Sequence, residues 1–140
     1  GADAVIQAAA PADFTPDVVS EHKIKKTGDA LTLTLKPTTD IAAALGRRKH
    51  PGQVLVAFAA ETQNLVENAR SKMVRKNADL VVANDVTRPG AGFGTDTNIV
   101  ILVTKDACRE LPQLSKREVA DAILDEVSAL WSSDPCDTAK

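Results

Sequence analysis

The fold is constrained most by several short apolar runs that are separated by segments with a helical pattern. Residues 4–10, 54–60 and 80–83 are apolar almost throughout. They do not alternate with polar residues, which is typical of strands buried on both faces of a parallel sheet. Residues 98–103 form a fourth run, and a helical pattern over residues 65–77 separates the second run from the third. Strands and helices in this order predict an α/β domain with a Rossmann-like, mostly parallel sheet flanked by helices.

The last predicted helix has the clearest start signal. Ser115 and Glu118 have the spacing of a capping box, in which each residue satisfies a free backbone N–H group of the other. Apolar residues then recur at helical spacing, at Val119, Ile123, Val127 and Leu130. This spacing predicts a helix with one apolar face directed toward the sheet.

Composition narrows the class of protein. With 140 residues, of which 44% are hydrophobic and 26% charged, the chain can bury a core as a single domain. No apolar run approaches the roughly 20 residues of a membrane span, and a net charge of −2 gives no argument for nucleic-acid binding. Cys108 and Cys136 lack the spacing of a disulfide framework or a metal motif. We therefore expect a reduced, cytoplasmic protein that binds neither nucleic acid nor membranes.

The beginning of the chain predicts an incomplete fold. The sequence starts within an apolar stretch, GADAVIQAAA, and only four buried strands are predicted. Doubly wound folds usually have more strands than this. We therefore expect that the first half of the fold is absent from this sequence.

A two-stranded arm is predicted between the first two apolar runs. Residues 21–26 and 31–36 flank a Thr-Gly-Asp turn signal at residues 27–29, and the second segment, LTLTLK, alternates apolar with polar residues. Residues 38–40, Thr-Thr-Asp, then supply N-cap candidates for a short alanine-rich helix. We expect this helix to end at Gly46, because glycine commonly terminates helices.

Several catalytic motifs are absent from the sequence. His22 and His50 have no partners at metal-ligand spacing, so no zinc site is predicted. There is no G-x-S-x-G motif, and Cys108 has no evident base beside it. The string PGAGFG at residues 89–94 leads into a strand instead of opening a helix. We interpret it as a flexible turn and not as a dinucleotide-binding fingerprint.

Lysines give the main positive signal for a binding site. Lys23, Lys25 and Lys26 cluster in the predicted arm. In the helix after the second apolar run, Lys72 and Lys76 lie within about 40° of each other around the helix axis, beside an apolar stripe. Two neighbouring ammonium groups repel each other, and a phosphate between them would relieve this repulsion. The alternative interpretation is a solvated basic face.

Polar residues follow three of the apolar runs, at the strand ends where open α/β sheets bind ligands. Asp13 follows the first run, Glu61 the second, and Asn84 and Asp85 the third. Asp13 could accept a hydrogen bond from the amino group of a base, bind a metal or simply form a turn. Asn84 and Asp85 have the same alternatives.

Six strings of the sequence follow one another in a specific order: AAAPADF, KIKK, TTDI, AFAAET, KNADLVVANDV and GFGTDTN. Together they resemble phosphopantothenate–cysteine ligase, the synthetase domain of the bifunctional coenzyme A biosynthesis flavoprotein of bacteria. The resemblance runs from about Ala4 to the final helix and covers the second half of that domain. The first half, with a glycine-rich phosphate loop and an essential asparagine, is not in this sequence. Two departures are Pro11, where the family often has a small or branched residue, and Thr38-Thr39, which replaces Asn-Pro.

This resemblance implies a reaction and its partners. The family joins 4'-phosphopantothenate to cysteine, using CTP and Mg²⁺, through an acyl-cytidylate intermediate. Residues 1–132 would be the nucleotide-binding part of the ligase domain, and residues 133–140 a flexible tail. A homodimer through the sheet is implied, as is a fused decarboxylase domain, which would hold FMN outside this chain. No residue is indicated as a metal ligand.

The resemblance also implies roles for individual residues. Lys23 would be the catalytic lysine, on a mobile arm that closes over the reactants. Lys72 and Lys76 would bind the triphosphate. The other nucleotide contacts would come from Ala9, Ala10 and Asp13 at the cytosine end, from Thr38, Thr39, Asp40 and Ile41 at a helix N-terminus, and from Phe58. Asn84 and Asp85 resemble the family's dimer-facing region and are left out of this set.

Two functional classes other than a ligase are alternatives for this sequence. The chain could be a nucleotide-binding or dimerisation module of that enzyme, with no catalytic activity of its own. It could also be a dinucleotide-binding dehydrogenase domain, but it lacks both the helix-opening glycine fingerprint and the ribose-binding acid that such a domain carries.

Overall fold

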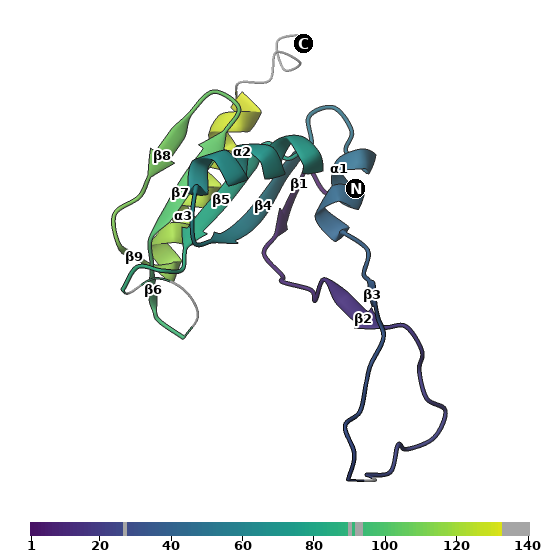
Figure 1. The fold of residues 1–140 in the computed structure, drawn as a ribbon. Helices are drawn as coiled ribbons and strands as arrows, with labels where there is room; N and C mark the ends of the chain where they lie inside the picture. Colours follow the sequence, from purple (N-terminus) through teal and green to yellow (C-terminus); the bar gives the residue numbers. More distant parts are fainter. Residues whose placement is uncertain (27, 90, 92–93, 133–140) are drawn as a thin grey trace.

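The computed structural model describes residues 1–26, 28–89, 91 and 94–132, and its centre is a five-stranded sheet (Figure 1). The strands lie in the order β1 (Ala4–Gln7), β4 (Val54–Glu61), β5 (Leu80–Asp85), β7 (Val100–Thr104) and β8 (Cys108–Glu110). β1, β4 and β5 pair in parallel, whereas β7 is antiparallel to both of its neighbours. Only β7 therefore runs against the common direction, and the predicted mostly parallel sheet is confirmed.

The reversed direction of β7 follows from its connection. β1 is connected to β4, and β4 to β5, by segments that contain a helix, but the described part of the connection from β5 to β7 contains none. A parallel neighbour normally requires a crossover with a helix, whereas a shorter loop returns the chain antiparallel. The run predicted over residues 98–103 is also divided. Asn98 belongs to β6 (Thr97–Asn98), which pairs with β9 (Leu114–Ser115), and β7 begins at Val100.

Helices cover both faces of the sheet. α3 (Lys116–Ser132) lies on one face, and α2 (Leu65–Lys76) and α1 (Ile41–Arg48) lie on the other (Figure 1). Alternate residues of β4 and β5 point to opposite faces, so that Val56 and Val82 pack with α3 while Leu55 and Val81 pack with α2. Burial on both faces is the reason why these strands are apolar without alternation.

The predicted start of the last helix is confirmed. The Ser115 hydroxyl accepts a hydrogen bond from the Glu118 N–H at 3.2 Å, and the Glu118 carboxylate accepts one from the Ser115 N–H at 2.8 Å. These reciprocal bonds form a capping box. The Ser115 hydroxyl also donates to the Glu118 carboxylate at 2.6 Å. This bond and the bond from the Ser115 N–H hold the pKa of Glu118 below its ordinary value, because both favour the charged carboxylate.

The prediction that the alanine-rich helix ends at Gly46 is wrong, because α1 continues to Arg48. Gly46 is buried where α1 meets the end of α2, and its carbonyl oxygen accepts a hydrogen bond of 2.9 Å from the Asn77 side chain. A Cβ atom at position 46 would overlap with the backbone carbonyl of Lys76. The glycine therefore permits a close approach between two helices and is not a helix terminator.

The predicted two-stranded arm is confirmed as an antiparallel pair, but the prediction that residues 21–26 and 31–36 form it is wrong. The paired strands are β2 (Phe14–Pro16) and β3 (Leu35–Pro37), at the base of the arm, and the described residues between them form no strand. Leu31, Leu33 and Leu35 are 65%, 58% and 52% exposed, so the alternating segment packs on no apolar layer. A two-stranded ribbon is marginally stable without such a layer. The arm extends away from the sheet and its helices (Figure 1).

Two predictions fall partly or wholly outside the described residues. The expected flexible tail over residues 133–140 lies outside them, as do Gly90, Gly92 and Phe93 of the glycine-containing turn. Within the part of the chain that the structure describes, no helix has the length and apolar character needed to cross a bilayer.

The contact at Gly46 generates a stability prediction. Alanine normally stabilises a helix by about 1 kcal/mol relative to glycine. At position 46 we expect the opposite sign, with Gly46→Ala lowering the free energy of unfolding by about 1–3 kcal/mol, because the added methyl group must displace backbone. Urea denaturation measures the change. Arg47→Ala, on the exposed side of the same helix, is the control and should shift the free energy by less than about 0.5 kcal/mol. A stabilising Gly46→Ala would contradict the close-approach explanation.

Candidate functional site

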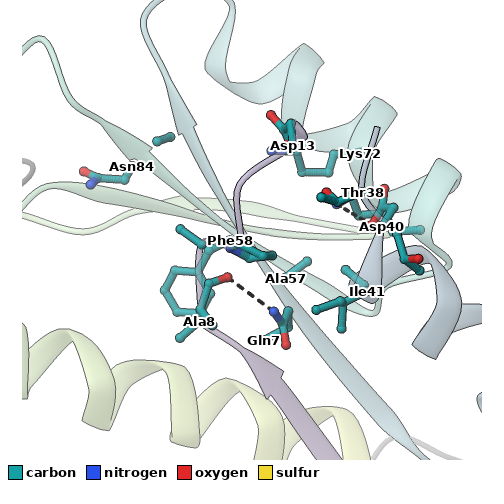
Figure 2. Close-up of a pocket in the computed structure, with 17 residues that line it drawn as sticks. Gln7, Ala8, Asp13, Thr38, Asp40, Ile41, Ala57, Phe58, Lys72 and Asn84 are labelled. Atoms are coloured by element: carbon teal, nitrogen blue, oxygen red, sulfur yellow. Dashed lines mark hydrogen bonds and ion pairs between the residues drawn. The ribbon is translucent and has the colours of Figure 1, made fainter. Parts of the chain in front are cut away.

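A pocket of about 470 Å³ lies where β1, β4 and β5 end, beside the beginning of α1 and one side of α2. Open α/β sheets bind their ligands at this carboxyl edge. Figure 2 shows Phe58 near Ala8 and Gln7, and Thr38, Asp40 and Ile41 on the α1 side. The lining residues are Gln7–Pro11, Asp13, Thr38–Ala42, Ala57, Phe58, Ala60, Lys72, Lys76 and Asn84.

The pocket brings together all of the expected site residues except Lys23. The set comprises Ala9, Ala10, Asp13, Thr38, Thr39, Asp40, Ile41, Phe58, Lys72 and Lys76. Lys23 is exposed in the arm, and it is not among the described residues that line the pocket. Lys25 and Lys26 are also exposed in the arm.

Lys72 and Lys76 lie one helical turn apart on α2, and the packing of that helix determines their position. Ala69 and Met73, on the buried side of α2, pack against the sheet. The side chains of Lys72 and Lys76 are only 18% and 17% exposed, so the alternative of a solvated basic face is wrong. Both lysines line the pocket, although most of each side chain is buried.

Each lysine has a carboxylate partner. The Lys76 Nζ donates to Asp40 Oδ1 at 3.1 Å, and the Lys72 Nζ lies 3.6 Å from Glu61 Oε1. The repulsion expected between the two ammonium groups is therefore offset by groups of the protein itself. These partners come from the loop before α1 and from the end of β4.

Asp40 also caps helix α1. Its Oδ1 accepts a hydrogen bond of 3.0 Å from the Ala43 N–H, as expected of an N-cap residue. This bond, together with the ammonium of Lys76, holds the pKa of Asp40 below its ordinary value, although partial burial acts in the opposite direction. Asp40 is therefore ionised throughout the neutral pH range.

The short ribbon at the base of the arm positions Asp13. Phe14 pairs with Pro37, the Thr38 N–H donates to the Asp13 carbonyl at 2.9 Å, and the Thr38 hydroxyl donates to the Ala12 carbonyl. Asp13 and Thr38 are therefore held side by side on the pocket wall. Both face the same space as Phe58, which is 37% exposed at the sheet edge.

Asn84 is a lining residue that the sequence interpretation left out. It is the second-last residue of β5 and pairs with Ala60 of β4, and its Oδ1 is buried and has no hydrogen-bond partner among the described residues. In Figure 2 it lies apart from the other labelled side chains. The signal in the sequence that pointed to Asn84 was its position directly after the apolar run over residues 80–83. The adjacent Asp85 instead accepts hydrogen bonds from the Thr87 hydroxyl at 2.6 Å and backbone N–H at 3.0 Å, which lower its pKa and fix the following turn.

The arrangement is chemically suited to an amphipathic, phosphorylated ligand. Its lining combines an aromatic side chain and several alanines with two lysines and two threonines. Among the described residues, no three His, Cys, Asp or Glu side chains gather as a metal site. Mg²⁺ is commonly held by one or two carboxylates together with substrate phosphates. Asp40 and Glu61 are the carboxylates beside the two lysines, and no metal ligand is assigned among them.

A second cavity, of about 580 Å³, lies at the opposite, amino end of β4 and β5. Its lining includes Lys49, His50, Lys105 and Trp131. Lys49 pairs with Asp79 at 2.7 Å, and the Trp131 indole N–H donates to the Gly52 carbonyl at 3.3 Å. None of the residues expected to bind a nucleotide lines this cavity.

Comparison with known proteins gives a consistent result. A family model, the C-terminal domain of the DNA/pantothenate metabolism flavoprotein, matches residues 1–130. The coenzyme A biosynthesis bifunctional protein CoaBC of Bacillus subtilis (strain 168) is 54% identical over 129 residues, which cover 91% of this chain and 32% of that protein. A cysteine/cysteine sulfinic acid decarboxylase of an unknown prokaryotic organism is 44% identical over 129 residues, which cover 91% and 36%.

Similarity extends to the fold. The crystal structure of the C-terminal domain of a coenzyme A biosynthesis bifunctional protein CoaBC superposes with a TM-score of 0.73 at 38% identity, covering 94% of this chain and 56% of that one. The chain spans about a third of the length of the two curated relatives. With a family match over nearly its whole length, the chain belongs to the DNA/pantothenate metabolism flavoprotein C-terminal domain family.

Proposed function

We propose that residues 1–132 are the nucleotide-binding part of a CTP-dependent phosphopantothenate–cysteine ligase that acts in coenzyme A biosynthesis. The observation that carries the proposal is one pocket, at the carboxyl edge of parallel strands, that is lined by an aromatic ring and by two mostly buried lysines one helical turn apart. The names of the CoaBC relatives support the same pathway. Because the chain spans only part of those relatives, the whole activity is assigned to the full-length protein.

The proposed reaction has two steps. A carboxylate oxygen of 4'-phosphopantothenate attacks the α-phosphorus of CTP, the bond to the β-phosphate breaks, and pyrophosphate leaves. The amine of cysteine then attacks the acyl carbon of the acyl-cytidylate, CMP leaves with the electrons of the broken C–O bond, and the amine loses a proton. Both steps place negative charge on phosphate oxygens, which fixed cationic groups stabilise. Mg²⁺ bound to the triphosphate would reduce its charge in the same way.

In this proposal different pocket residues contact different parts of the nucleotide. Lys72 and Lys76 donate to the phosphates, and Phe58 packs against the nucleotide. The Asp13 carboxylate accepts a hydrogen bond from the amino group of cytosine, beside the backbone of Ala9 and Ala10. Residues 38–41 contact the nucleotide where the backbone N–H groups of α1 begin.

Lys23 acts from the arm. Val19 and Ile24 are 85% and 58% exposed, so the arm has little apolar packing to hold it in the position described. We propose that the arm closes over bound reactants, which excludes water from the acyl-cytidylate and brings Lys23 to the reacting phosphate. A homodimer through the sheet and a fused, FMN-binding decarboxylase domain belong to the same proposal.

The proposal is tested by the turnover of CTP. The full-length protein, given CTP, Mg²⁺, 4'-phosphopantothenate and cysteine, should release pyrophosphate and CMP in equal amounts. Lys23→Ala should reduce turnover at least ~100-fold with a much smaller change in CTP affinity, because Lys23 reaches the phosphate only after closure. Lys25→Ala, two residues away on the same arm, is the matched control and should have a smaller effect. Near-normal turnover in Lys23→Ala would remove the assigned role. A wild type that binds CTP without turnover would favour the non-catalytic module.

Asp13 generates a prediction about base selection. A site that hydrogen-bonds a polar group rejects analogues lacking that group more strongly than an apolar pocket does. Asp13→Ala should therefore lose discrimination between CTP and UTP more than it loses affinity for the triphosphate, as measured by calorimetry on the full-length protein. Asp17→Ala, an exposed carboxylate at the end of the same ribbon, is the control. If the preference for CTP survives in Asp13→Ala, another group reads the base.

A further inference from the structure

Each of the two lysines that line the pocket is paired with a carboxylate. Glu61 lies at the end of β4 with Oε1 at 3.6 Å from the Lys72 Nζ, and its Oε2 accepts a hydrogen bond of 3.0 Å from the Asn68 side chain. Asn68 also donates to the Gln63 carbonyl at 3.0 Å. Glu61 is therefore held in place from its other side, independently of Lys72.

Asp40 is fixed in the same manner. Its bond to the Ala43 N–H makes it the cap of α1, and this bond holds its carboxylate beside Lys76 independently of the lysine itself. The two carboxylates come from different elements and meet lysines that are one turn apart on α2. The arrangement thus contains two separately anchored ion pairs.

These pairs weaken the attraction of the site for a bare phosphate. Two ammonium groups and two carboxylates have no net formal charge, and a phosphate that reaches either lysine also approaches a carboxylate of the same sign as itself. A nucleotide has further contacts in the pocket, because its base and ribose reach the walls formed by Phe58 and Asp13. Inorganic pyrophosphate can contact only the groups that bind phosphate. The nearby carboxylates therefore reduce its binding free energy by a larger fraction than that of a nucleotide.

We propose that Glu61 and Asp40 compete with phosphate for Lys72 and Lys76, so that the site binds an incoming nucleoside triphosphate but releases pyrophosphate. The inference rests on the proposed function, in which pyrophosphate is the leaving group of the first step. Glu61 and Asp40 are then residues that set product affinity by acting through the lysines.

The test is the affinity for inorganic pyrophosphate in the full-length protein, measured by calorimetry at fixed Mg²⁺ and fixed ionic strength. Glu61→Gln keeps the length of the side chain and an oxygen that can accept from Asn68, but removes the charge beside Lys72. We expect pyrophosphate to bind about 3- to 10-fold more tightly, in the lower part of the range measured for coupled neighbouring residues, and CTP affinity to rise by a smaller factor. Asp121→Asn, which removes the same charge from an exposed ion pair with Arg117 on α3, should leave both affinities unchanged.

A double-mutant cycle with Lys72→Met attributes the effect to the ion pair. Once Lys72 is gone, Glu61→Gln should no longer tighten pyrophosphate binding. Asp40→Asn is a second, independent variant, because asparagine is an equally good N-cap and the helix is retained. It should tighten pyrophosphate binding through Lys76 in the same way.

The outcomes distinguish a failure of the competition from a failure of the proposed function. Unchanged or weaker pyrophosphate binding in both Glu61→Gln and Asp40→Asn, with Lys72→Met still losing affinity, would overturn the competition and leave the nucleotide site in place. Weaker binding would show instead that the carboxylates position the lysines. A wild type that binds neither CTP nor pyrophosphate, or a Lys72→Met variant with normal pyrophosphate affinity, would overturn the proposed function itself, and the competition with it.

Discussion

The parallel pairing of β1, β4 and β5 between two layers of helices is the constraint on which the rest of the structure depends. Val56, Leu80 and Val82 are fully buried. Their burial fixes the register of the paired strands, because a shift by one residue would turn each side chain to the other face of the sheet. Parallel strands end at one edge, and the segments that follow β1, β4 and β5 therefore converge there. The pocket lies at this convergence, and its polar groups derive their positions from the buried sheet behind them.

The packing of α1 on α2 then determines the electrostatics of the site. Ala69 and Met73 fix α2 on the sheet, and Gly46 lets α1 approach the end of α2 so closely that Asp40 meets Lys76. The lysines are consequently neither free nor solvated, and a ligand must share them with carboxylates. Under the proposed function, such a site favours ligands with both a base and phosphates over simple anions, because it relies on shape and on several moderate contacts.

Much of this structure could be predicted from local patterns. The apolar runs located β4 and β5, whereas the first run predicted a longer and more buried strand than β1, which ends at Gln7. The Ser115–Glu118 spacing located the start of α3, and helical periodicity placed Lys72 and Lys76 beside the buried stripe of α2. These features depend on short-range rules of burial and hydrogen bonding. The resemblance carried by the ordered motifs predicted the remaining site residues. All of these residues except Lys23, which lies in the arm, line the pocket.

Features that depend on tertiary contacts could not be predicted in this way. Gly46 has the local signature of a helix end, but its role is set by the Lys76 carbonyl, which is distant in sequence. The LTLTLK segment has the alternation of a strand, but no apolar layer lies beneath it. The pairs Glu61–Lys72 and Asp40–Lys76 also join separate elements, so sequence spacing alone indicated two lysines without their partners.

The most direct test of the central claim is a crystal structure of the full-length protein with CTP bound. The account predicts phosphate oxygens within about 2.7–3.2 Å of the Lys72 and Lys76 ammonium groups, and the cytosine beside Phe58 with its amino group directed at Asp13. CTP bound instead in the cavity lined by Lys49, His50 and Trp131, or with its phosphates away from α2, would contradict the account.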